Sequence, residues 1–209
     1  MNKALMFSLA GVTGVGASGL LAVNHMKNKN SIRNKFPKSL IGEKDDGIWV
    51  ARVKSLVAQG SSPFNEKLKK VKATPLASNE PTEESKALLK KACQEIYDSY
   101  FSGEDSNEFK DLKSFCSKNN KDVAPQDKWF TEDTTSSAGT KWSARLTALK
   151  GHSGSLVQKL KDLQSKITET NSHTKENATA LKNWCDSIAS DMYVDDLGYS
   201  NMVLFCRES

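Results

Sequence analysis

The sequence has few of the residues from which catalytic and metal sites are built. It holds three histidines, His25, His152 and His173, and no two of them have the spacing of metal ligands. Its four cysteines include no C-x-x-C pair, so a zinc ribbon and thioredoxin-like redox chemistry are poorly supported. The pattern implies no Cys–His nucleophile either. We therefore expect a protein that is not an enzyme, with no catalytic residue, no cofactor and no metal site.

Acidic residues are absent from the first 38 positions, so the net positive charge of the chain is concentrated there. Six of the 30 Lys and Arg residues lie there, which leaves 24 against 25 acidic residues in the remainder. Because the remainder has no excess of positive charge, we do not expect a nucleic acid partner. The basic segment is placed to meet anionic lipid headgroups, so membrane lipid is the expected partner.

Charged residues are also absent from residues 4–23, a run of twenty. A helix of that length rises about 30 Å, which is the thickness of the hydrocarbon core of a bilayer. We expect residues 4–23 to form a single transmembrane helix, and residues 1–38 to form a membrane anchor with a basic juxtamembrane segment. The alternative is a signal peptide cleaved near the small residues 17–19. The apolar run continues beyond that point, which favours an uncleaved anchor.

The orientation of this anchor stays open at the level of sequence. Five basic residues follow the uncharged run and only Lys3 precedes it, so the positive-inside rule places the domain in the cytoplasm. The even number of cysteines favours the oxidising, exported side of the membrane. The two indications disagree.

An internal similarity runs through the rest of the chain. Residues 49–56, WVARVKSL, match residues 142–149, WSARLTAL, at an offset of 93. Matches recur downstream at offsets of 92 and 90, with apolar character kept at the matched positions. Register held across four segments favours a duplication over chance similarity. We therefore expect two tandem helical repeats, at residues 39–116 and 141–209, joined by a polar linker at residues 117–140.

The hydrophobic periodicity within each repeat is helical, and no stretch alternates convincingly at period two. Three apolar stripes have helical spacing: Leu89, Cys93, Ile96, Tyr97 and Tyr100; Leu156, Leu160, Leu163 and Ile167; and Trp49, Val53, Leu56 and Val57. Thr82, followed by two glutamates, predicts the start of the helix that carries the first stripe. We expect an all-α protein, in which an N-terminal transmembrane helix precedes a domain of two tandem repeats of about four helices each.

The four cysteines occupy matching places in the two repeats, Cys93 and Cys116 in the first, Cys185 and Cys206 in the second. Four cysteines allow three disulfide connectivities, and symmetry alone leaves all three open. Proximity along the chain favours Cys93–Cys116 and Cys185–Cys206. The alternative is that the thiols stay reduced and act as small core residues, because each lies on an apolar face.

Two arginines are the most informative polar residues. Arg52 and Arg145 each lie three positions after the tryptophan of their repeat, hence on the same helical face as Trp49 and Trp142. A guanidinium there can stack on the indole, pair with a carboxylate of a neighbouring helix or bind an anionic ligand. A half-buried arginine is normally paired, which favours a structural role. We expect both tryptophans to be buried and both arginines to pair with carboxylates.

The whole pattern resembles the large paralogous families of uncharacterised proteins in hemotropic mycoplasmas. The motifs that carry the resemblance are the W-x-A-R segments at Trp49 and Trp142 and the Phe-Cys pairs at Phe115 and Phe205. Members of these families are similar in having an apolar N-terminal segment, no lipobox and a Lys/Asn/Ser-rich remainder. The resemblance implies no known activity, cofactor or catalytic residue. It does imply exposure at the host interface.

We expect, from these observations together, a membrane-anchored surface protein without enzymatic activity that acts as an interaction module. The single span places it in the cell membrane with its domain extracellular, facing a protein partner that the sequence does not identify. The alternative is a membrane-tethered cytoplasmic scaffold, whose cysteines are reduced and whose basic flank rests on the inner leaflet.

Overall fold

The computed structural model describes residues 29–124, 129–130, 134, 140–168 and 174–207. Within these ranges the chain forms helices and no strand, and its β-type pairing is confined to isolated bridges. The all-α prediction is confirmed for this part of the chain. The expected transmembrane helix at residues 4–23 lies outside the described residues. None of the helices inside them is both long and apolar enough to cross a bilayer.

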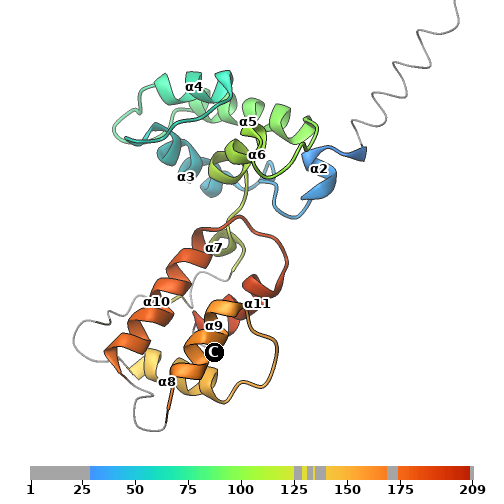
Figure 1. The fold of residues 1–209 in the computed structure, drawn as a ribbon. Helices are drawn as coiled ribbons and strands as arrows, with labels where there is room; N and C mark the ends of the chain where they lie inside the picture. The colour runs from blue at the N-terminus through green and yellow to red at the C-terminus, as the bar shows by residue number, and fades with distance from the viewer. Residues whose placement is uncertain (1–28, 125–128, 131–133, 135–139, 169–173, 208–209) are drawn as a thin grey trace, which may run out of the picture.

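The described residues fold into two helical lobes that follow one another along the chain (Figure 1). The first lobe comprises the described residues of 29–117, and the second lobe those of 118–207. The helices of the first lobe are α2 (Ile32–Lys35), α3 (Asp46–Val57), α4 (Glu66–Ala73), α5 (Glu83–Asp98), α6 (Asn107–Asp111) and the π-helix η1 (Leu112–Cys116). Those of the second lobe are α7 (Asn120–Val123), α8 (Thr140–Lys150), α9 (Gln158–Lys166), α10 (Lys175–Ser190) and α11 (Leu197–Phe205).

Each lobe has a hydrophobic core of its own. The first core surrounds Trp49 and Leu89, and the second surrounds Trp142 and Leu181. One residue crosses between the lobes, because Met192 of the α10–α11 loop is buried among the residues of the first core. Burial of a large apolar side chain stabilises the fold by roughly 1.5–3 kcal/mol. These cores, rather than intrinsic helix propensity, therefore hold the short helices in place.

Corresponding threonines begin the long helix of each lobe. The side-chain oxygen of Thr82 accepts a hydrogen bond from the backbone N–H of Ser85 at 3.1 Å, which caps α5. Thr174 caps α10 in the same way, through the N–H of Asn177 at 3.3 Å. Such a cap satisfies a backbone donor that the helix itself cannot, and contributes on the order of 1 kcal/mol. The predicted helix start at Thr82 is confirmed.

The predicted apolar stripe of α5 is buried, with one exception. Its buried members are Leu89, Cys93, Ile96 and Tyr97. Tyr100, predicted to continue the stripe, is 52% exposed, so the prediction is wrong at that position. The physical reason is that α5 ends at Asp98, and the cap residue Ser99 takes an extended conformation. Helical spacing no longer applies beyond that point.

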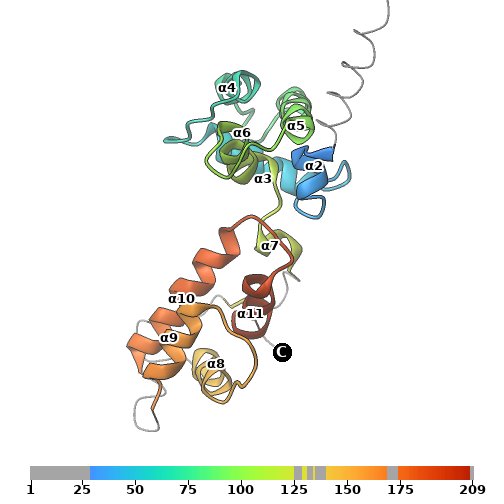
Figure 2. The ribbon, with the colours of Figure 1, turned by 45° about the vertical axis from the view of Figure 1, so that its right-hand side comes forward.

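A short helix at the entrance of the first lobe is held by backbone hydrogen bonds. The N–H of Ile32 donates to the carbonyl of Ser99 at 3.1 Å, and the N–H of Phe101 donates to the carbonyl of Asn30 at 2.9 Å. These bonds fix α2 beside the end of α5 and the loop that follows it (Figure 2). Ile32 is buried. The folded part of the chain therefore begins within residues 1–38, which were predicted as anchor and juxtamembrane segment.

The second lobe has a matching entrance. The N–H of Asn120 donates to the carbonyl of Asp191 at 2.9 Å, and the N–H of Tyr193 donates to the carbonyl of Lys118 at 2.9 Å. α7 thus lies beside the end of α10 as α2 lies beside the end of α5. The start of the predicted polar linker at residues 117–140 is thus folded into the second lobe, while residues 125–128, 131–133 and 135–139 of it lie outside the described residues. Its polar residues are used there, as Asn120 shows by donating its side-chain amide to the carbonyl of Ile188 at 2.8 Å.

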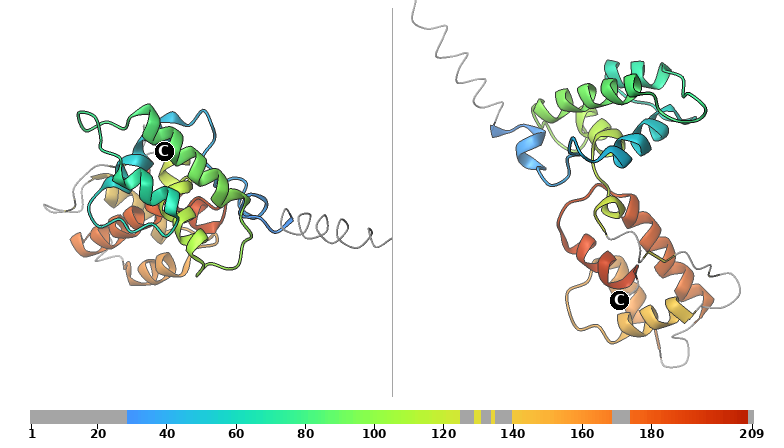
Figure 3. Two further views of the ribbon diagram at one scale, coloured as in Figure 1. Left: turned by 90° about the horizontal axis from the view of Figure 1, so that it is seen from above. Right: turned by 180° about the vertical axis from the view of Figure 1, so that it is seen from behind.

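The two lobes meet where the chain passes from the first lobe into α7 (Figure 3). The N–H of Lys118 donates to the carbonyl of Ser39 in the first lobe at 2.7 Å, while its carbonyl accepts from Tyr193 in the second. The hydroxyl of Ser39 donates to the carbonyl of Tyr193 at 2.5 Å. Because Met192 inserts next to this point, the junction combines hydrogen bonds and ion pairs with apolar burial.

Candidate functional site

The W-x-A-R motif of the first lobe lies at the junction between the lobes. Trp49 is fully buried, and its indole N–H donates to the carbonyl of Gly42 at 2.9 Å. Arg52 donates through Nε to the carbonyl of Ser117 at 3.1 Å and forms an ion pair with Asp122 of α7. The predicted burial of Trp49 and the predicted carboxylate partner of Arg52 are both confirmed. Arg52 thereby ties α3 to the segment that connects the lobes.

The second W-x-A-R motif forms an aromatic cluster. Trp142 is buried, as predicted, with its ring edge-on to that of Phe130 at a centroid distance of 5.0 Å. The guanidinium carbon of Arg145 lies 5.7 Å from the centroid of the same Phe130 ring. A cation–π contact of this kind contributes about 0.5–2 kcal/mol. The ring under Arg145 is thus Phe130 rather than the tryptophan of its own motif, and its pairing with a carboxylate stays a prediction.

The four cysteines meet in pairs within each lobe. Cys93 is joined to Cys116 and Cys185 to Cys206, with Cα atoms 5.3 and 5.5 Å apart. Each pair connects the long helix of its lobe to the short element that follows, and all four side chains are buried. In the first lobe the hydroxyl of Tyr97 donates to the carbonyl of Cys116 at 2.6 Å, and burial raises the pKa of Tyr97. The oxidation of these thiols in the cell stays a prediction.

Asp111, which the sequence analysis did not single out, organises the loop between α3 and α4. It is buried, and its carboxylate accepts from the N–H of Phe64 at 3.0 Å and from the N–H of Asn65 at 2.6 Å. In the second lobe the side-chain oxygen of Asn201 accepts from the N–H of Val157 at 2.9 Å. Positions 111 and 201 are 90 apart, the offset of the last matched segment. That offset is the signal from which both residues could have been found.

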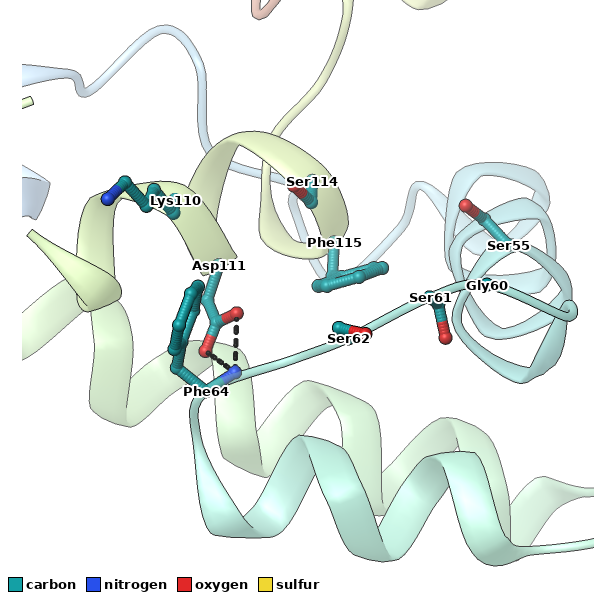
Figure 4. Close-up of a pocket in the computed structure, with 9 residues that line it drawn as sticks. All are labelled: Ser55, Gly60, Ser61, Ser62, Phe64, Lys110, Asp111, Ser114 and Phe115. Carbon is teal, nitrogen blue, oxygen red and sulfur yellow. Dashed lines mark hydrogen bonds between the residues drawn. The ribbon is translucent and has the colours of Figure 1, made fainter. Parts of the chain in front are cut away.

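A cavity of about 410 Å³ opens beside Asp111 (Figure 4). Its lining includes Ser55, Ser61, Ser62, Ser114, Gly60, the rings of Phe64 and Phe115, and Lys110. The dashed lines in Figure 4 show the Asp111 carboxylate directed at the backbone N–H of Phe64. Burial raises the pKa of Asp111, and the backbone hydrogen bonds oppose the shift only in part. The Asp111 carboxylate therefore anchors its loop, and the cavity beside it is lined by hydroxyl groups and phenyl rings.

A second cavity, of about 580 Å³, lies between α9 and α10. Trp184 and Ser187 line it. At an offset of 92, the matching positions in the first lobe hold Ala92 and Glu95, and Glu95 forms an ion pair with Lys67 across α4 and α5. Ser187 has no carboxylate, so the second lobe cannot form the ion pair that Glu95 makes in the first. The two lobes therefore differ at this surface although their helices follow the same order.

The described part of the chain contains no group of three His, Cys, Asp or Glu side chains that could hold a metal ion. His152 is half-buried, with its ring edge-on to that of Phe205 at a centroid distance of 5.4 Å. His25 and His173 lie outside the described residues.

The residues predicted from sequence do not converge on one site. Arg52 and Arg145 lie in different lobes, on α3 and α8, and each cysteine pair is internal to its own lobe. Comparisons with protein-family models, with curated proteins and with solved structures gave no match to this chain.

Proposed function

We propose that this protein is a membrane-anchored interaction module of the cell surface, without enzymatic activity of its own. The uncharged run at residues 4–23 anchors it as a single transmembrane helix, and the two lobes face the outside of the cell. Its partner is a protein at the host interface, in line with the resemblance to the families of hemotropic mycoplasmas.

The observation that carries the outward orientation is the cysteine pairing. Each lobe has one intralobe pair, and the separations along the chain are 23 and 21 residues. Disulfides persist in exported proteins and are rare in the cytosol. A link that closes a loop of this size contributes on the order of 3 kcal/mol, in a model-dependent way. That contribution matters here, because small domains bury too little surface to be stable by a wide margin.

We further propose that the two lobes are tandem copies of one helical unit. Five matching features support this proposal: the threonine caps of the long helices, the entrance hydrogen bonds of α2 and α7, the loop anchors Asp111 and Asn201, the buried motif tryptophans and the cysteine pairs. The second unit then begins at residue 118, inside the segment that was predicted to be a linker. A duplicated unit presents two related surfaces, which suits a module that binds rather than one that catalyses.

The chemistry of the Asp111 cavity supports a binding role. Among the described residues its lining contains no histidine, and its carboxylate, that of Asp111, is engaged by the backbone N–H groups of Phe64 and Asn65. Hydroxyl groups beside the rings of Phe64 and Phe115 offer a partner hydrogen bonds and apolar contact together.

A membrane-tethered cytoplasmic scaffold is the second candidate function, and the charge distribution favours it. Five basic residues follow the uncharged run and one precedes it, which is the pattern of a domain retained in the cytoplasm. In that orientation the cysteines are reduced, and the basic flank rests on the anionic inner leaflet.

Protease shaving of intact cells separates the two candidates. We expect peptides from both lobes to be released from intact cells, and their mass spectra under non-reducing conditions to contain the two intralobe links. A cytoplasmic protein must stay intact in the same samples, and permeabilised cells provide the measure of how readily the folded lobes are cleaved. Protection of both lobes until the cells are permeabilised would establish the scaffold instead.

A further inference from the structure

Tyr100 and Met192 occupy corresponding places in the two lobes, but only one of them is covered. Each forms an isolated antiparallel bridge with the entrance segment of its own lobe, Tyr100 with Ser31 and Met192 with Asn119. Met192 is 8% exposed, because the first lobe packs over it, whereas Tyr100 is 52% exposed. The first lobe therefore covers one end of the second, and the matching end of the first lobe presents a large aromatic side chain to its surroundings.

Aromatic and basic side chains gather at this uncovered end. The rings of Phe36 and Phe101 lie 5.3 Å apart between centroids, and Nζ of Lys35 lies 4.7 Å from the centroid of Phe101. Arg33 pairs with Asp98 at 2.8 Å, so the carboxylate of Asp98 offsets the positive charge of Arg33. The ammonium group of Lys35 adds a second positive charge. Tyrosine and basic residues are the types that membrane–water interfaces favour. We call Arg33, Lys35, Tyr100 and Phe101 the entrance patch. Phe36 is not counted, because it also lines a cavity with Met192 and Val194 of the second lobe.

The chain enters the first lobe beside the entrance patch. The carbonyl of Asn30 accepts from the N–H of Phe101 at 2.9 Å, which fixes the point of entry. The proposed membrane span ends at Val23, and residues 24–29 lie between Val23 and Asn30. Six residues span at most about 20 Å when fully extended. If residues 4–23 span the membrane, its surface lies within that distance of the patch.

We propose that the entrance patch docks on the headgroup region of the membrane, with the Tyr100 ring at the interface. This inference rests on the anchor proposed above. In this arrangement the lipid surface covers Tyr100 at the end of the first lobe, just as the first lobe covers Met192 at the end of the second. Tethering favours lipid over a second copy of the chain, because the anchor holds the bilayer near the patch at a high effective concentration. Arg33 and Lys35 favour an anionic headgroup.

The test uses the full chain in vesicles of phosphatidylcholine and phosphatidylglycerol, with and without brominated acyl chains. Two variants each add one tryptophan at a half-exposed position. Tyr100→Trp reports on the entrance patch, and Leu204→Trp, at a residue of the second lobe that is 48% exposed, is the matched control. The wild-type spectrum is subtracted, because the chain has four tryptophans of its own. We expect the added tryptophan at position 100 to emit further to the blue and to lose intensity with brominated lipid. The tryptophan at position 204 should do neither.

Vesicle flotation distinguishes the ways in which the inference can fail. If the protein floats with the vesicles but position 100 is not quenched, the docking is overturned and the anchor stands. If the protein does not float, the proposed anchor fails and the docking fails with it. A blue shift without quenching that disappears when the protein is diluted in lipid means that a second copy covers Tyr100, which also overturns the docking. Weaker quenching in vesicles without phosphatidylglycerol would support the role of the basic residues.

Discussion

Arg52 of α3 and Asp122 of α7 form an ion pair across 70 residues of chain, and the pair lies on the boundary between the lobes. Their side chains are only 11% and 18% exposed. Asp122 also accepts from the N–H of Asn119 at 2.8 Å, so the same carboxylate caps α7 and receives the guanidinium. An ion pair withdrawn from water to this degree depends on both partners, because either one alone is left as a poorly solvated charge.

We expect Arg52→Ala to lower the free energy of unfolding by about 2–4 kcal/mol, since it also removes a hydrogen bond to the carbonyl of Ser117. Lys54→Ala on the same helix is the control. Lys54 pairs with Glu80, but these side chains are 42% and 65% exposed, so its loss should change the stability by no more than about 1 kcal/mol. Denaturant unfolding with the disulfides intact measures both. Equal effects from the two variants would show that Arg52 does not hold the junction.

Asp111→Asn should change how stability depends on pH. Burial raises the pKa of Asp111 in the folded state above its value in the unfolded chain. The folded state then binds the proton more tightly, so the contribution of Asp111 is full below about pH 4 and falls as the pH rises through the folded-state pKa. An amide does not titrate. We therefore expect the variant to gain stability relative to the wild type as the pH rises from about 4 to 7, measured by denaturant unfolding at each pH.

The reciprocal variant, Asn201→Asp, is the control for Asp111. The amide of Asn201 accepts from Val157 and donates to the carbonyl of Ser155 at 3.1 Å. A carboxylate cannot donate when ionised, so the variant should lose about 1–3 kcal/mol, and more at pH 7 than at pH 4. A pH-independent effect in both variants would contradict the assignment of these residues as matching loop anchors.

Sequence periodicity predicted the parts of the fold that depend on regular burial. Trp49, Trp142 and the stripe on α5 are core positions because helical spacing places them on one face. Periodicity failed at Tyr100, which lies beyond the end of α5. The backbone there is held by hydrogen bonds of Ser99 and Phe101 to Ile32 and Asn30, which are distant in sequence.

Polar composition did not reveal the burial of Asn120. This residue lies at the start of the segment predicted to be a linker, yet it is buried and bonded to α10. A buried polar residue differs from a solvated one only in its tertiary partners, and these are not visible in local sequence. Asp111 was missed for the same reason, since it acts on a backbone 46 and 47 residues away.

Trp49→Ala and Trp142→Ala should each lower the free energy of unfolding by about 3–5 kcal/mol, because both remove a large buried side chain and leave a cavity. Leu204→Ala, at an exposed position, should stay within about 0.5 kcal/mol of the wild type. Thermal or denaturant unfolding provides the comparison. A near-neutral result at both tryptophans would mean that the W-x-A-R motif is a surface feature.

The cysteine pairs lead to a prediction about compartment as well as stability. Material taken from the native membrane and digested without reduction should yield Cys93–Cys116 and Cys185–Cys206 as linked peptides. Replacing both cysteines of one lobe by serine should lower the free energy of unfolding by about 3 kcal/mol, since each link closes a loop of 23 or 21 residues. Treatment of the wild type with a reductant is the matching control, and it should add little to a variant that lacks all four cysteines.

The peptide analysis has three possible outcomes, and each supports a different description of this protein. Links within each lobe support an exported protein whose two units are each stabilised by their own cross-link. Four free thiols in membrane-derived material would instead favour the cytoplasmic scaffold, because buried cysteines in the cytosol are kept reduced and pack as small apolar residues. Links between Cys93 or Cys116 and a cysteine of the second lobe would contradict the intralobe geometry, in which the paired Cα atoms lie 5.3 and 5.5 Å apart. In that case the lobes would not be independent units, and the proposed duplication would describe their sequence but not the way they are held together.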